Sequence, residues 1–172
     1  NRTLEGMKIV LDCANGAAYK AAPVIFSELL ADVTVIHCEP DGININDRCG
    51  SQHTEGLAAK VLEIEADIGL AFDGDGDRLI AVDERGREIT GDHIMAICGK
   101  RYKEQGLLTN NLVVATVMSN FGFFSAMRGL GIEAAASKAV GLQIGIGRIE
   151  ARWQGLNPDL VLDRVTVADR DA

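Results

Sequence analysis

The chain has 172 residues, of which 47% are hydrophobic, and its 17 basic and 25 acidic residues give a formal net charge of −8. This length fits one large domain or one domain with part of a second, and it is sufficient to bury a core without disulfides or metal ions. Such an acidic chain is poorly suited to a nucleic-acid backbone or an anionic membrane surface, so we expect neither as a partner. An anionic substrate would therefore require a local positive charge or a bound cation.

The four cysteines form no Cys-x-x-Cys pair and lie near no histidine pair, so their spacing excludes zinc-finger and thioredoxin-type sites. The sequence shows no basic-then-apolar leader and no apolar run of membrane-spanning length. We therefore expect free thiols and a cytoplasmic location. Since the chain starts at Asn1 and leads directly into a predicted strand, we expect it to begin within a longer protein.

Alternating strand and helix patterns fill the first part of the chain. A short apolar run predicts a strand over Lys8–Asp12, apolar residues at helical spacing predict a helix over Tyr19–Ala31, and a β-branched run predicts a strand over Val33–His37. This succession is typical of a βαβ unit with parallel strands. A turn-rich loop over Glu39–Thr54 and a helix over Glu55–Glu65 follow.

The same alternation continues beyond this helix. Strands are predicted at Ile68–Phe72, Leu79–Val82 and Glu88–Ile89, and a helix from Gly91 to about Glu104. The turn-rich segment Gly106–Asn111 is the predicted boundary between a first domain, 1–106, and a second, 107–172.

The second domain begins with the same pattern. A strand is predicted over Leu112–Thr116 and a helix over Phe121–Arg128, and the pattern weakens beyond Val140. Leu160–Leu162 and Val165–Val167 are predicted to form a strand pair. The whole chain is thus expected to be an α/β protein with mixed, mostly parallel sheets and flanking helices.

The strongest chemical signal is the segment Asp73-Gly74-Asp75-Gly76-Asp77-Arg78, directly after a predicted strand. Glycines allow the loop to curl, so that three carboxylates at alternate positions point toward one place. Such carboxylates repel one another unless a hard cation holds them, and Mg²⁺ prefers oxygen ligands. We therefore predict Asp73, Asp75 and Asp77 as metal ligands and Arg78 as a phosphate-binding residue.

Three alternatives apply to this segment. A solvated turn would also contain Asp and Gly, although three regularly spaced carboxylates after a strand disfavour it. An EF-hand loop requires glycine where Arg78 stands and helices on both sides, so it is excluded. A haloacid-dehalogenase-type phosphatase would use Asp73 as nucleophile but would have Thr or Val in place of Asp77, and this alternative is weaker.

Several further blocks narrow the interpretation. They are DCANGAA at Asp12–Ala18, PDGININ at Pro40–Asn46, CGS at Cys49–Ser51 and VMSN at Val117–Asn120. Together with the Asp73–Arg78 loop, they resemble the α-D-phosphohexomutase family over about Gly6–Gly141. They are more similar to its amino-sugar branch than to the phosphomannomutase and phosphoglucomutase branches. The resemblance implies one complete phosphohexomutase-type domain followed by a partial second one.

The resemblance also implies a reaction, the reversible transfer of phosphate between the 6- and 1-positions of glucosamine phosphate. In the family a phosphoserine donates its phosphate, and a bisphosphorylated sugar then re-phosphorylates the serine. Mg²⁺ bridges that phosphoserine and three aspartates, here Asp73, Asp75 and Asp77. Phosphoryl transfer requires positioning and neutralisation of charge, which a metal ion and Arg78 can supply. A phosphorylated hexosamine is therefore the expected substrate and Mg²⁺ the expected cofactor.

The chain departs from the family in two respects. The donor serine belongs to a Thr-Ala-Ser-His-Asn-Pro-like string that is absent here, so we predict no catalytic residue within this chain. The second domain diverges after residue 141, where the family continues toward its sugar-binding loop, and a disrupted reading frame between Val140 and Leu162 would explain this pattern. We therefore expect a fragment that lacks the N- and C-terminal domains of the whole protein and is inactive alone.

Other polar residues receive weaker predictions. Ser119 and Asn120 follow a predicted strand and are candidates for the substrate side of the site. The loop Asn44–Ser51 is expected to shape an interface or to support the metal loop, with a structural role favoured. His37, His53 and His93 have no carboxylate or cysteine at ligand spacing, so we expect them to be structural or solvated.

Overall fold

The computed structural model describes residues 3–137, 142–154 and 157–169. Its internal contacts divide the chain into two compact units, Asn1–Gly91 and Asp92–Ala172, which are described separately. The predicted point of divergence after residue 141 lies outside the described residues.

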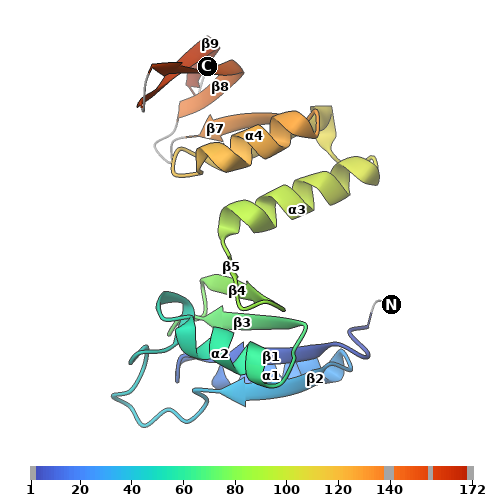
Figure 1. Ribbon diagram of the computed structural model, residues 1–172, viewed down its shortest axis with the longest axis vertical. Coiled ribbons are helices and arrows are strands. Elements are labelled where there is room, and N and C mark those ends of the chain that lie inside the picture. The colour runs from blue at the N-terminus through green and yellow to red at the C-terminus, as the bar shows by residue number, and fades with distance from the viewer. Residues whose placement is uncertain (1–2, 138–141, 155–156, 170–172) are drawn as a thin grey trace. The chain divides into compact units, whose positions relative to one another are not determined.

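The first unit contains a five-stranded sheet with the order β2-β1-β3-β4-β5 (Figure 1). Parallel pairing joins β1 to β2 and to β3, as the βαβ pattern predicts, whereas β4 and β5 are antiparallel. The sheet is therefore mixed. The strands are β1 (Lys8–Asp12), β2 (Asp32–Ile36), β3 (Ile68–Phe72), β4 (Leu79–Asp83) and β5 (Glu88–Ile89).

Two helices, α1 (Ala18–Glu28) and α2 (Glu55–Glu63), lie between the parallel strands in sequence, and η1 (Gly50–Gln52) is a short 3₁₀ turn before α2. Successive side chains of β1 point to opposite faces of the sheet. Ile9 and Leu11 pack in a core with residues of α1, and Val10 packs with Leu57 and Val61 of α2. One helix therefore covers each face, and both cores exclude water from the middle of β1.

The register of the parallel strands decides where the polar residues gather. Asp12 is aligned with Ile36 of β2 and with Ala71 of β3. The segments that follow β1, β2 and β3 therefore all leave the sheet at one edge. In open α/β sheets this carboxyl edge is where ligands bind.

The second unit begins with α3 (Gly91–Glu104) and continues with η2 (Thr109–Asn111), β6 (Leu112–Thr116), α4 (Phe121–Gly129) and β7 (Glu133–Ser137). Strands β6 and β7 are parallel. The division between the units falls before the predicted boundary at Gly106, because α3 shares the second unit's core. A Cβ on Gly99 would lie 3.3 Å from the side chains of Met127 and Val113.

Strand β7 has no counterpart among the predicted elements. Its sequence, Glu-Ala-Ala-Ala-Ser, has the composition of a helix rather than a strand. Pairing with β6, packing of Ala134 against the core that includes Phe123 and Met127 of α4, and burial of Ala136 override that local preference. Among the described residues, no helix combines the length and the apolar character required to cross a membrane.

The last described elements are two long antiparallel strands, β8 (Leu142–Gln154) and β9 (Asn157–Asp169). The predicted pairing of Leu160–Leu162 with Val165–Val167 is wrong, because both runs belong to β9. They pair with β8 instead. Only Asp163-Arg164 separates the two runs, and this dipeptide supplies none of the Gly or Asn residues that a two-residue hairpin turn favours.

Candidate metal centre

The segment Asp73–Arg78 joins β3 to its antiparallel neighbour β4 at the carboxyl edge of the sheet. Asp73 is only 3% exposed, whereas Asp75 and Asp77 are exposed to solvent. Gly76 closes the turn by donating its N–H to the carbonyl of Asp73 at 3.1 Å, with a φ of +76° that favours glycine. The loop therefore begins inside the protein and presents its remaining aspartates at the surface.

The structure brings together the three aspartates that the sequence singled out. Each offers one carboxylate oxygen, and these oxygens all lie within 4.8 Å of one another. The set contains only oxygen donors and is partly exposed, which suits a hard divalent cation that keeps some of its water ligands. Asp73, Asp75 and Asp77 thus fit an Mg²⁺ site in donor chemistry and spacing, and their role as ligands remains a prediction.

Arg78 fixes the buried member of the set. Its backbone N–H donates to Asp73 Oδ1 at 3.0 Å, and its side-chain Nε donates to Asp73 Oδ2 at 2.9 Å. The same Nε lies 3.6 Å from Asp77 Oδ1. The Arg78 side chain is 68% exposed, so it remains accessible beside the carboxylates. Its predicted contact with phosphate therefore remains sterically open.

The ionisation of the loop reflects this crowding. Burial opposes the charged form of Asp73, but hydrogen bonds from the Arg78 backbone, the Asp77 side chain and the Arg78 side chain outweigh it and lower its pKa to about 2. The pKa of Asp77 is raised by its hydrogen bond to Asp73 and by the negative charges of Asp75 and Asp73. Arg78 therefore only partly offsets the repulsion among the three carboxylates, and a cation would offset it further.

Two neighbouring segments enclose the start of the loop. Ala17 donates its backbone N–H to the carbonyl of Gly74 at 2.7 Å. A Cβ on Gly74 would lie 2.6 Å from Asn46 Nδ2 and 2.7 Å from the side chain of Ile45, so both side chains would have to move to admit one. These contacts agree with the expectation that the loop Asn44–Ser51 supports the metal loop.

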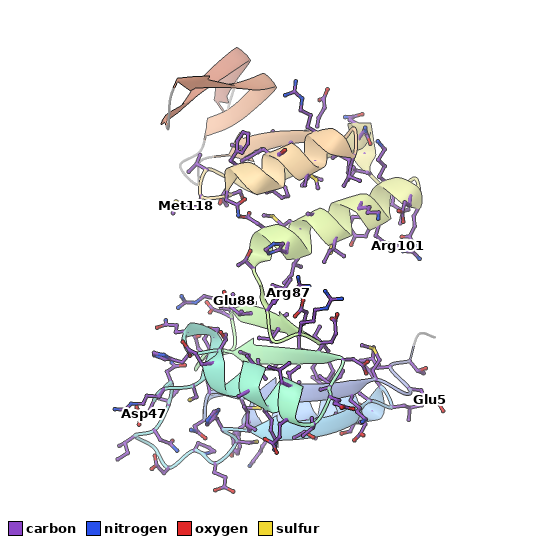
Figure 2. The ribbon with its side chains drawn as sticks, viewed as in Figure 1. Glu5, Asp47, Arg87, Glu88, Arg101 and Met118 are labelled. Carbon is purple, nitrogen blue, oxygen red and sulfur yellow. The ribbon has the colours of Figure 1, made fainter. Side chains whose placement is uncertain are left out.

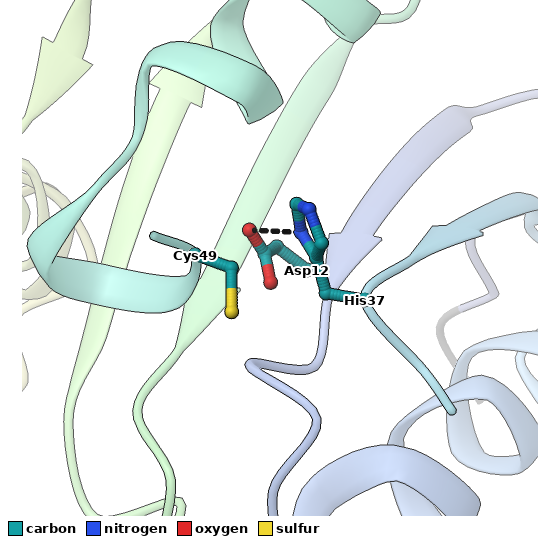
Figure 3. Close-up of side chains that lie close together, drawn as sticks. All are labelled: Asp12, His37 and Cys49. Atoms are coloured by element: carbon teal, nitrogen blue, oxygen red, sulfur yellow. Dashed lines mark hydrogen bonds and ion pairs between the residues drawn. The ribbon is translucent and has the colours of Figure 1, made fainter. Parts of the chain in front are cut away.

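A buried polar cluster, which the sequence did not predict, lies at the same edge. It consists of Asp12, His37 and Cys49 (Figure 3). His37 Nδ1 lies 3.0 Å from Asp12 Oδ2, a carboxylate partner that sequence spacing did not indicate, and this contact agrees with the structural role expected for His37. The residues are far apart in sequence: the parallel register of β1 and β2 places His37 beside Asp12, and the Gly50 N–H on Asp12 Oδ2 holds the Cys49–Gly50 backbone next to them. Asp12 ends an apolar strand and His37 directly follows one, but no sequence signal indicated Cys49.

The two predicted substrate-side residues belong to the second unit. Ser119 and Asn120 follow β6, and Asn120 caps α4 by accepting the N–H of Phe123 at 3.0 Å. The backbone N–H of Asn120 donates to Asp92 Oδ2 at 2.9 Å. Met118 in the same turn is 86% exposed (Figure 2). Asn120 therefore has a structural role, and contact of either residue with substrate remains a prediction.

Comparison with known proteins places both units in one family. The profile of the phosphoglucomutase/phosphomannomutase alpha/beta/alpha domain II matches residues 1–86, and the profile of domain III matches residues 90–144. Phosphoglucosamine mutases of Syntrophobacter fumaroxidans and Syntrophus aciditrophicus are 62% and 58% identical over 136 residues. These alignments cover 79% of this chain and 30% of each relative, so the chain spans under a third of their length.

Solved structures give the same result. A phosphoglucomutase/phosphomannomutase family protein of Burkholderia thailandensis aligns with a TM-score of 0.64 and 26% identity, covering 78% of this chain and 30% of that one. An N-acetylglucosamine-phosphate mutase aligns with a TM-score of 0.56, covering 82% of this chain and 37% of that one, and its 16% identity supports the fold alone.

The enclosure of Gly74 generates a prediction. Gly74→Ala should lower the free energy of unfolding by about 1–3 kcal/mol and shift the backbone amide resonances of Asp73–Arg78, because the added methyl group displaces Asn46 and Ile45. Gly91→Ala is the control, since nothing lies within 4 Å of its added Cβ. Urea unfolding and amide chemical shifts provide the measurement. Equal effects of the two substitutions would contradict the enclosure.

Proposed function

Because this chain belongs to the phosphoglucomutase/phosphomannomutase family, we propose that it forms part of an enzyme that interconverts glucosamine 6-phosphate and glucosamine 1-phosphate. The high identity to relatives named phosphoglucosamine mutase supports the amino sugar over mannose or glucose phosphates. A phosphomannomutase or phosphoglucomutase activity is the second candidate, since the family includes both. The four free thiols are consistent with a reducing compartment such as the cytoplasm.

The observation that carries this proposal is the grouping of Asp73, Asp75 and Asp77 on one loop, with oxygens within 4.8 Å of one another. We assign Mg²⁺ to these three residues. When bound, the ion would neutralise charge on the phosphoryl group and on its oxygen donor during transfer. The loop itself contributes position, because the buried Asp73 cannot turn away from the site without breaking two hydrogen bonds to Arg78.

Arg78 has a second role in the proposal. Its exposed guanidinium carries N–H donors in a planar fork, which matches the geometry of phosphate oxygens. Asp73 occupies its Nε, while the outer part of the fork faces solvent. The side chain can therefore hold a phosphate next to the aspartates and remain anchored to the loop.

An aspartyl-phosphate mechanism on Asp73 is less well supported. Both oxygens of this carboxylate accept hydrogen bonds from Arg78, and the side chain is nearly buried. A nucleophile in phosphoryl transfer requires an oxygen that is accessible for in-line attack. The environment of Asp73 favours a fixed ligand.

Magnesium binding tests the metal assignment. Asp75→Asn should lower the Mg²⁺ affinity of the chain by about tenfold or more, because it removes one charged oxygen ligand without altering the buried core. Glu84→Gln, an exposed acidic residue on the β4–β5 turn, should leave the affinity unchanged. Titration calorimetry measures both. Absence of a Mg²⁺ response in the unaltered chain would favour the solvated turn.

The activity of the chain alone tests whether catalysis requires further domains of the enzyme. The sequence lacks the family's donor-serine string and the sugar-binding loop. A coupled assay with glucosamine 6-phosphate should therefore give turnover at least about 10³-fold below that of an intact phosphoglucosamine mutase. Turnover close to that of the intact enzyme would overturn the expected dependence on further domains.

A further inference from the structure

Asp12 is a fully buried carboxylate at the end of β1. Burying a charge is unfavourable unless hydrogen-bond donors surround it. Three donors do so here: the Ala14 N–H reaches Oδ1 at 2.9 Å, the Gly50 N–H reaches Oδ2 at 3.0 Å, and His37 Nδ1 lies 3.0 Å from Oδ2 (Figure 3). The Asp12 side chain thus contacts three parts of the chain: the turn after β1, the residue after β2, and the Asn44–Ser51 loop.

The geometry points to a positioning role for Asp12: we propose that its carboxylate holds in place the two backbone segments that enclose the metal loop. This inference rests on the proposed metal site at Asp73, Asp75 and Asp77. Asp12 lies outside the metal loop and would affect the metal site only through the segments that it holds in place.

The first segment is the turn Ala14–Ala17. Ala14 and Asn15 have φ values of +52° and +46°, a conformation that is unfavourable for alanine. The hydrogen bond from Ala14 to Asp12 stabilises this turn. This conformation places the Ala17 N–H on the carbonyl of Gly74. The backbones approach so closely here that a Cβ on Gly16 would lie only 2.3 Å from the carbonyl oxygen of Gly74.

The second segment is Ile45–Gly50. A Cβ on Gly50 would lie 2.5 Å from the carbonyl of Phe72, the residue before Asp73. At the other end of the segment, Asn46 donates its N–H to the carbonyl of Ala14 at 2.9 Å and contacts Gly74 through its side chain. The two segments therefore support each other, and Asp12 is hydrogen-bonded to both.

The cluster of Asp12, His37 and Cys49 is better explained as this hydrogen-bond centre than as a second cation site. Asp12 is fully buried and its two oxygens share three donors, so a cation there would have to lose its water ligands and displace a donor, whereas the partly exposed loop Asp73–Arg78 allows a cation to keep water ligands. Burial and the nearby Asp12 raise the pKa of the Cys49 thiol, which disfavours the thiolate that a metal ion requires.

Amide hydrogen exchange of the metal-free chain tests the proposal. Asp12→Asn keeps the shape of the side chain but places an amide donor against N–H groups. The exchange of the Ala17 and Gly50 amides should accelerate by at least about tenfold, and the Mg²⁺ affinity should fall. Asp67→Asn is the matched control, since Asp67 accepts the Lys8 N–H at 2.8 Å at the opposite end of β1. It should leave both quantities unchanged.

Equal exchange at Ala17 and Gly50 in the two variants would overturn the positioning role. If Asp12→Asn does not fold, amide exchange of the unaltered chain tests the positioning role. There the amides of Ala14, Ala17 and Gly50 should open together, with rates that agree within about twofold, and independent opening would contradict the proposal. Because exchange is measured without metal, failure of the chain to bind Mg²⁺ would refute the proposed function and leave this result valid.

Discussion

Parallel strands that lie side by side end at the same edge of a sheet, and this constraint governs the first unit of the chain. The alignment of β1 with β2 and β3 brings Asp12, His37 and Asp73 to one edge although long stretches of sequence separate them. Both helices that connect the parallel strands are short, and their apolar faces cover opposite sides of the sheet. The polar edge therefore rests on a rigid apolar base, which suits a site that must hold charged groups in fixed positions.

Repulsion among carboxylates is the second constraint. The three aspartates occupy alternate positions of a short loop but have different environments. Asp73 is fixed by hydrogen bonds to both of its oxygens, whereas Asp75 and Asp77 are exposed to solvent. The order of the residues explains the arrangement, because the first aspartate directly follows a buried strand and the others lie on the turn. The proposed cation site would therefore require little rearrangement of Asp73.

Much of this arrangement could be predicted from local sequence. The strands and helices of the first unit follow their apolar periodicity, and the spacing of Asp73, Asp75 and Asp77 after an apolar strand indicated the candidate site. Strand β7 could not be predicted, because pairing with β6 outweighs the helical preference of its alanines. The hydrogen bonds of Asp12 could not be predicted from the sequence either. They depend on the register between strands and on residues with a left-handed backbone conformation, such as Ala14. In both cases, contacts between residues far apart in sequence determine the local structure.

Paramagnetic Mn²⁺ provides the most direct measurement of the central claim, because it broadens the amide signals nearest to where it binds. Substoichiometric Mn²⁺ added to the chain should broaden Gly74, Gly76 and Arg78 before any other residue, and excess Mg²⁺ should restore these signals. Broadening that begins at the acidic β4–β5 turn around Asp83 and Glu84, or around His37 and Cys49, would contradict the assignment of the metal site to Asp73, Asp75 and Asp77.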